Sequence, residues 1–184
     1  MVSVTSLWLP ILVAAALVFV VSSVIHMLLG YHAADYGAVP AEDDVQAALR
    51  KFSLSPGDYM VPCPKGSKPT QDFIDKHRRG PALLMTVMPA GEMAMGAQLA
   101  MWFVYCVVTG TLVGYVAGIA LPAGADYRAV FRLASTVAFI GYVLALWQMS
   151  IWYRKSWGST LRSTLDGLIY ALLTAGVFGW LWPR

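Results

Sequence analysis

Charged residues are scarce in this chain, and their scarcity excludes an ordinary soluble domain. Of the 184 residues only 12% are Asp, Glu, Lys or Arg, whereas 58% are hydrophobic. Soluble domains carry about 25% charged residues. The formal net charge is only +3. Because nucleic-acid binding needs a concentrated basic surface, we expect no nucleic acid among the partners of this protein.

Cysteine, histidine and catalytic signatures are equally sparse. Cys63 lies in a polar stretch and Cys106 in an apolar run, so the two are not expected to form a disulfide. The three histidines all precede residue 97, which argues against a bis-histidine haem inside one helix bundle. Nucleotide-binding glycine patterns, Gly-x-Ser-x-Gly and His-Glu-x-x-His are missing. We expect a non-enzymatic protein, with an intramembrane enzyme as the alternative.

Four long apolar runs, over residues 7–29, 97–121, 130–152 and 165–181, dominate what is present. Each approaches the roughly 20 residues that a helix needs to cross the hydrocarbon core of a bilayer. All seven tryptophans lie at or near the ends of these runs, where indole rings favour the level of the lipid headgroups. The runs predict an all-α integral membrane protein with four transmembrane helices in a lipid bilayer.

The predicted organisation is a bundle with one long connection. We place transmembrane helices at 7–30, 97–121, 130–153 and 162–182, and an extramembrane loop domain at 31–96. An even number of spans puts both termini on one side of the membrane. Basic residues near the spans number three on that side (Arg128, Arg132, Arg184) and six on the other (Lys76, Arg78, Arg79, Arg154, Lys155, Arg162). This difference favours a cytoplasmic loop domain.

The loop domain has the sequence of a small mixed α/β fold. Acidic residues at 42–44 followed by a basic pair at 50–51 indicate a short helix. Residues 59–61 and 82–88 are typical of two short strands. Thr70 is a suitable cap for a helix over 71–79, which Gly80-Pro81 would end.

Small residues recur every four positions in the later runs. The second run contains Cys106, Gly110, Gly114 and Gly118, and the fourth contains Ser159, Ser163, Gly167, Ala171, Ala175 and Gly179. Such stripes let helix backbones approach closely in lipid. They have two interpretations: packing inside one bundle, or a glycine zipper between subunits. We expect a homo-oligomer, a dimer or a trimer, that uses at least one of these faces.

Asp166 is the one acidic residue within a predicted span. Arg162 lies four residues earlier, so an ion pair along the helix is one interpretation. The other is a carboxylate that faces a cavity and binds a cation or a proton. His26, on one face with Ser22, is a second candidate, and Gln148 ends a small-residue stripe on the third run. The Asp-Tyr pairs that begin at 35, 58 and 126 are interpreted as turns and caps.

A metal site is a further hypothesis. Its candidate ligands are His26, His32, Cys63, Met93 and Met95. Soft sulfur together with imidazole suits copper. The spacings are not diagnostic, however, and methionine is a common filler of apolar gaps. We expect no bound cofactor, with copper as the alternative.

Several segments resemble an uncharacterised group of small bacterial four-span membrane proteins. They are residues 24–27 with His32 and Asp35-Tyr36, residues 56–60, residues 166–170 and residues 174–183. The resemblance implies a bacterial inner-membrane setting, and it brings no assigned activity. The leading functional hypothesis is therefore an oligomeric membrane protein for small-ion or solute permeation, or for membrane scaffolding. The alternative is a metal-handling (copper) or redox protein.

Overall fold

The computed structural model describes residues 1–92 and 94–184. It divides the chain into a membrane unit, Met1–Tyr36 with Ala94–Arg184, and a loop unit, Gly37–Met93. The membrane unit thus includes Tyr31–Tyr36, which follow the first predicted span.

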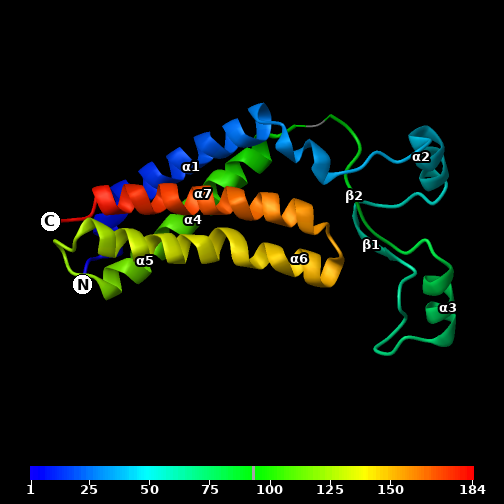
Figure 1. Ribbon diagram of the computed structural model, residues 1–184. Coiled ribbons are helices and arrows are strands. Elements are labelled where there is room, and N and C mark those ends of the chain that lie inside the picture. The colour runs from blue at the N-terminus through cyan, green and yellow to red at the C-terminus, as the bar shows by residue number, and fades with distance from the viewer. Residues whose placement is uncertain (93) are drawn as a thin grey trace. The chain divides into compact units, whose positions relative to one another are not determined.

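Four helices of the membrane unit are long and apolar enough to cross a membrane. They are α1 (Trp8–Leu28) with its leading turn η1 (Val4–Leu7), α4 (Gly96–Ala120), α5 (Tyr127–Phe139) continued by the π-helical turn η3 (Ile140–Leu144) and α6 (Ala145–Tyr153), and α7 (Trp157–Trp180) (Figure 1). These helices indicate a membrane protein, as the apolar runs predict. The fourth begins at Trp157, five residues before the predicted start at 162.

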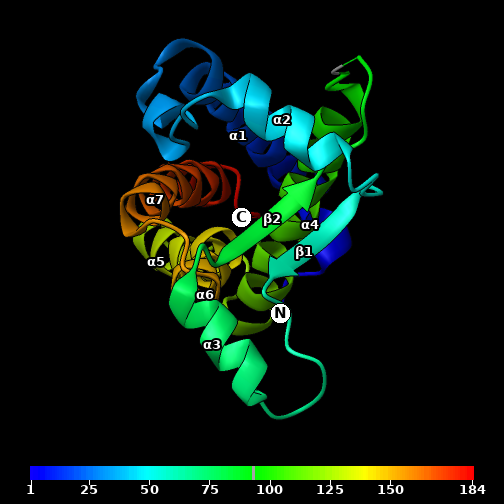
Figure 2. The same ribbon diagram turned by 90° about the vertical axis from the view of Figure 1, so that its right-hand side faces the viewer.

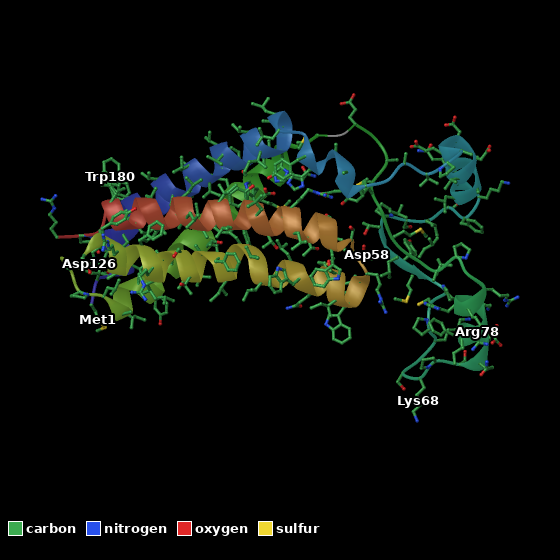
Figure 3. The ribbon with its side chains drawn as sticks, in the orientation of Figure 1. Met1, Asp58, Lys68, Arg78, Asp126 and Trp180 are labelled. Carbon is green, nitrogen blue, oxygen red and sulfur yellow. The ribbon has the colours of Figure 1, made fainter. Side chains whose placement is uncertain are left out.

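The helices contact one another in a closed ring, in which α1 packs on α4 and α7, and α5 packs on the same two helices. Figure 2 views this arrangement along the bundle. Both termini lie at one end of it (Figure 1). Met1, Asp126 and Trp180 mark that end in Figure 3. The α6–α7 connection lies at the opposite end (Figure 1).

The small-residue stripes form the contacts inside this bundle. A Cβ atom added at Gly110 would lie 3.4 Å from Ile11 of α1, and one at Gly118 would overlap the backbone oxygen of Val2. On α7, a Cβ atom at Gly167 would overlap the side chain of Val143. Ala171 and Ala175 are fully buried as well. The contacts at these positions are therefore made by residues of the same chain, which is the first of the two interpretations above.

The loop unit contains α2 (Glu42–Arg50), β1 (Gly57–Val61), α3 (Gln71–Arg79) and β2 (Leu83–Val87). The strands pair antiparallel, with Gly57 opposite Val87 (Figure 2). Thr70 Oγ1 accepts a hydrogen bond from Phe73 N and caps α3, as the sequence predicts. None of the described residues between Gly37 and Glu92 is buried. This unit thus has a defined strand pairing but no hydrophobic core within its described part.

Candidate functional site

The chain reverses direction where α1 ends, and this reversal builds the site. Gly30 has a φ of 63°, in the left-handed region that glycine adopts without strain. The next residues form the short 3₁₀ helix η2 (Tyr31–Asp35), which packs on α7. Residues that directly follow the first span therefore meet side chains from the fourth.

Asp166 is the centre of this contact. It lies on α7 about 14 Å along the axis from Trp157, at a rise of about 1.5 Å per residue, and is only 3% exposed. Tyr31 Oη donates to Asp166 Oδ1, and His32 Nε2 lies 2.7 Å from Asp166 Oδ2. Both carboxylate oxygens thus have a partner from η2, which satisfies a buried acid that would otherwise be costly.

Arg162 does not pair with Asp166, and that interpretation of the sequence is wrong. Its Nε and Nη2 lie 2.8 and 2.5 Å from Oδ1 of Asp35. The other oxygen of Asp35 lies 2.7 Å from His32 Nδ1. Asp35, interpreted from the sequence as part of a turn or cap, ends η2, and both of its oxygens bind side chains.

Asp35 lies outside the membrane-spanning segments, and its environment favours the ionised form. Partial burial acts to raise the pKa of its carboxyl group. The hydrogen bonds from His32 and Arg162 and the charge of Arg162 outweigh that effect and hold the pKa below its ordinary value of 3.8. Asp35 is therefore a fixed negative charge between two donors.

His32 connects the two carboxylates. Its Nδ1 faces Asp35 and its Nε2 faces Asp166, each at 2.7 Å. Two hydrogen bonds of this kind need two protons: either both nitrogens carry one, or a neutral ring accepts a proton held by one carboxyl group. The rings of Tyr31 and His26 both pack against the imidazole, with centroids 4.5 Å away. These contacts fix the plane of the ring.

His26 completes the group and is its exposed member. Its Nε2 lies 4.0 Å from Asp166 Oδ2, and its side chain is 52% exposed. One donor atom each from His26, His32 and Asp166 lies within 4.8 Å of the others. These three residues could hold a metal ion. We refer to the six residues Tyr31, His26, His32, Asp35, Arg162 and Asp166 as the Asp166 cluster.

The charges of the Asp166 cluster do not cancel when both imidazoles are neutral. Asp35 and Asp166 contribute two negative charges and Arg162 one positive charge. The balance of one negative charge favours a proton or a cation at the histidines, because an uncompensated charge is expensive at low dielectric. The cluster is thus arranged to accept positive charge.

Buried hydroxyl groups continue from Asp166 along the same face of α7. Tyr170 and Thr174 follow at intervals of four residues, and both are buried. Neither hydroxyl oxygen has a hydrogen-bond partner among the described residues. The ring of Tyr170 packs edge-on against Tyr142 and Trp102, at centroid distances of 5.7 and 5.9 Å. The interior beside the cluster is therefore aromatic and polar rather than aliphatic.

The remaining predicted site residues lie elsewhere. Gln148 is exposed on α6. Met95 is exposed and precedes α4, Cys63 is exposed in the loop unit, and Met93 lies outside the described residues. Of the proposed copper ligands, the structure brings His26 and His32 together.

Tyr31 and Asp35 are the members of the cluster that sequence reasoning missed. Tyr31 is 135 residues from Asp166, and Asp35 is 127 residues from Arg162. Spacing within one helix carries no information about such pairs. The one local signal is Gly30, whose left-handed conformation turns the chain back toward the bundle. No family model, curated protein or solved structure matches the chain.

Proposed function

We propose that this is a membrane protein through which a small cation passes, and that Asp166 is the group that accepts the cation at the η2 end of the bundle. The observation that carries the proposal is the buried carboxylate of Asp166 inside a predicted span, held by Tyr31 and His32. Ionisable residues at membrane depth commonly mark ion or proton pathways.

His26 supplies the access that such a function needs. Half of its side chain is exposed, and its Nε2 lies 4.0 Å from Asp166 Oδ2. A cation that arrives from solvent therefore meets an imidazole before it reaches the buried carboxylate. When the proton between His32 and Asp166 is absent, the Asp166 cluster carries one net negative charge, which attracts the cation.

The hydroxyls of Tyr170 and Thr174 are the proposed continuation of the path. A buried hydroxyl without a partner costs about 1–3 kcal/mol, and internal water usually removes that cost. Two such groups on the face of α7 that carries Asp166 favour a hydrated path over a purely structural ion pair. This arrangement also favours permeation over scaffolding.

Assembly and location belong to the same proposal. We retain a homo-oligomer, a dimer or trimer, in the bacterial inner membrane, with the loop unit on the cytoplasmic side. The faces of Gly114 and Gly167 are filled within the chain, so subunits would meet through other faces. The exposed apolar side chains of α4, among them Val104, Val108 and Leu112, are available for such contacts.

Reconstituted vesicles test the proposal. Protein-containing and empty vesicles are compared for flux of protons, Na⁺, K⁺ and Zn²⁺ with dyes selective for each. We expect flux of at least one cation in the wild type and its loss in Asp166→Asn. Asp72→Asn, a matched change on α3 where the carboxylate pairs with Lys76, should keep wild-type flux. Wild-type vesicles that conduct none of these ions above the empty ones would refute the proposal.

A further inference from the structure

We infer that the Asp166 cluster binds a divalent transition-metal ion of the Zn²⁺ class through His26 Nε2, His32 Nε2 and Asp166 Oδ2. The inference rests on the proposed function, because it names the cation that Asp166 accepts. It also replaces the soft copper set predicted from the sequence with a set of two nitrogens and one oxygen.

The distances between the donor atoms fit such an ion. Ligand atoms about 2.1 Å from a tetrahedral metal lie about 3.4 Å from one another. In the cluster, Asp166 Oδ2 lies 2.7 Å from His32 Nε2 and 4.0 Å from His26 Nε2, and all three atoms lie within 4.8 Å. The distances of 2.7 and 4.0 Å from Asp166 Oδ2 lie on either side of the roughly 3.4 Å that a tetrahedral ion requires.

Hydrogen bonds behind the ligands provide independent support. Histidines that bind metals usually donate their other ring nitrogen to a carboxylate, which fixes the tautomer and orients the ring. His32 Nδ1 faces Asp35 Oδ2 at 2.7 Å, and Arg162 holds the other oxygen of Asp35. Tyr31 holds Asp166 Oδ1, and Asp166 Oδ2 faces His32 Nε2 at 2.7 Å, where an ion would take the place of the shared proton. Two of the three ligands, His32 and Asp166, are therefore held in place by hydrogen bonds to other residues.

The donor types and the charge select the metal class. Two imidazoles and one carboxylate suit Zn²⁺, Co²⁺, Ni²⁺, Fe²⁺ and Cu²⁺, whereas Mg²⁺ and Ca²⁺ favour all-oxygen sites and Cu⁺ favours sulfur. With neutral imidazoles the cluster carries one net negative charge, and a cation at this point takes the place of the proton between His32 and Asp166. Three protein ligands leave the fourth position of a tetrahedral ion for water or another exchangeable ligand.

Cobalt titration of the detergent-purified full chain, stripped with EDTA, tests the site. Visible absorption of tetrahedrally bound Co²⁺ reports occupancy, and Zn²⁺ competition gives the affinity. We expect one Co²⁺ per chain, displaced by Zn²⁺. His26→Gln should weaken binding more than about tenfold, and Asp35→Asn should weaken it about 10–100-fold with the stoichiometry kept. His77→Gln, the matched change in the loop unit, should bind as the wild type does.

His26 is half exposed, so we expect His26→Gln to leave the melting temperature unchanged. A loss of Co²⁺ affinity in this variant can then be assigned to the missing ligand and not to unfolding. Equal affinity in wild type and His26→Gln, or no saturable binding at one ion per chain, would overturn the inference. Vesicle flux separates it from the proposed function. Stoichiometric Co²⁺ binding without flux of any cation would support the metal site and refute cation permeation. Proton flux without metal binding would support permeation and refute the metal site.

Discussion

Arg162 pairs with Asp35 rather than with Asp166, which lies four residues further along the same helix. The guanidinium donates to Oδ1 of Asp35 from two nitrogens, at 2.8 and 2.5 Å. The hydrogen-bond partners of Asp166 are therefore Tyr31 and His32. The short helix η2 therefore contacts α7 through two side chains, Arg162 and Asp166. Oδ2 of Asp166 faces both His32 and His26.

The Tyr31–Asp166 hydrogen bond should stabilise the fold measurably. Tyr31→Phe removes the donor and leaves Asp166 Oδ1 buried without it. Hydrogen bonds to charged groups contribute about 1.5–3 kcal/mol, so we expect the free energy of unfolding to fall by about that amount. Thermal unfolding in detergent measures it. Tyr36→Phe, at a ring that is 85% exposed, is the control and should show no change; equal melting temperatures for both variants would contradict the prediction.

Asp35 should make stability depend on pH under acid conditions. Because its pKa in the folded protein lies below the ordinary 3.8, its stabilising contribution is complete above that value and is lost as the pH falls through the lower, folded-state pKa. Melting temperatures in EDTA from pH 6 to pH 3 should fall most steeply below about pH 4. Asp35→Asn should be less stable at neutral pH and show a shallower fall. The control is Asp43→Asn on α2, which should keep the wild-type dependence of melting temperature on pH. If Asp35→Asn also keeps that dependence, the prediction is wrong.

Gly167→Ala should lower the free energy of unfolding. A methyl group there would overlap Val143 and lie 3.4 Å from Tyr142 Cβ, so α7 and η3 would have to separate. Overpacking of this kind costs about 1–3 kcal/mol. Gly176→Ala on the same helix is the matched control, since its new Cβ meets only the Tyr127 hydroxyl at 3.9 Å. Alanine favours a helix over glycine by up to about 1 kcal/mol, so Gly176→Ala should be neutral or stabilising. Comparable melting temperatures for the two variants would refute the close contact.

Tyr170→Phe should separate permeation from stability. Its hydroxyl has no hydrogen-bond partner among the described residues, so removing it should leave the melting temperature unchanged or raise it. The ring contacts with Tyr142 and Trp102 are kept. If the hydroxyl lines the cation path, vesicle flux should fall while folding holds. Tyr115→Phe, at an exposed ring on α4, should retain full flux. Normal flux in Tyr170→Phe would show that the path does not use this group.

Features that depend on neighbours in the chain were predictable from the sequence. The four spans follow from apolar runs of sufficient length. Asp126 accepts hydrogen bonds from the backbone nitrogens of Arg128 and Ala129 and caps α5, as its position before a helical run predicts. Thr70 caps α3 in the same way. In each case the partners lie within a few residues, so one short segment contains all the atoms involved.

The candidate site was predictable only in part. Asp166 and His26 are conspicuous because ionisable groups are rare in apolar runs. Their partners are not, because a helix presents Asp166 to whatever segment packs against that face. The sequence offers Arg162 at helical spacing, whereas the structure supplies Tyr31 and His32 from more than 130 residues away.

The sequence by itself determined that this protein has four helices long and apolar enough to cross a membrane, and that Asp126 and Thr70 cap α5 and α3, since hydropathy and capping act over a few consecutive residues. Tertiary structure decided that the glycine stripes are buried within one chain and that η2 folds onto α7. It also decided that His26, His32 and Asp166 meet at one point. These outcomes depend on which helices become neighbours, and that choice is made by side-chain packing across the whole bundle.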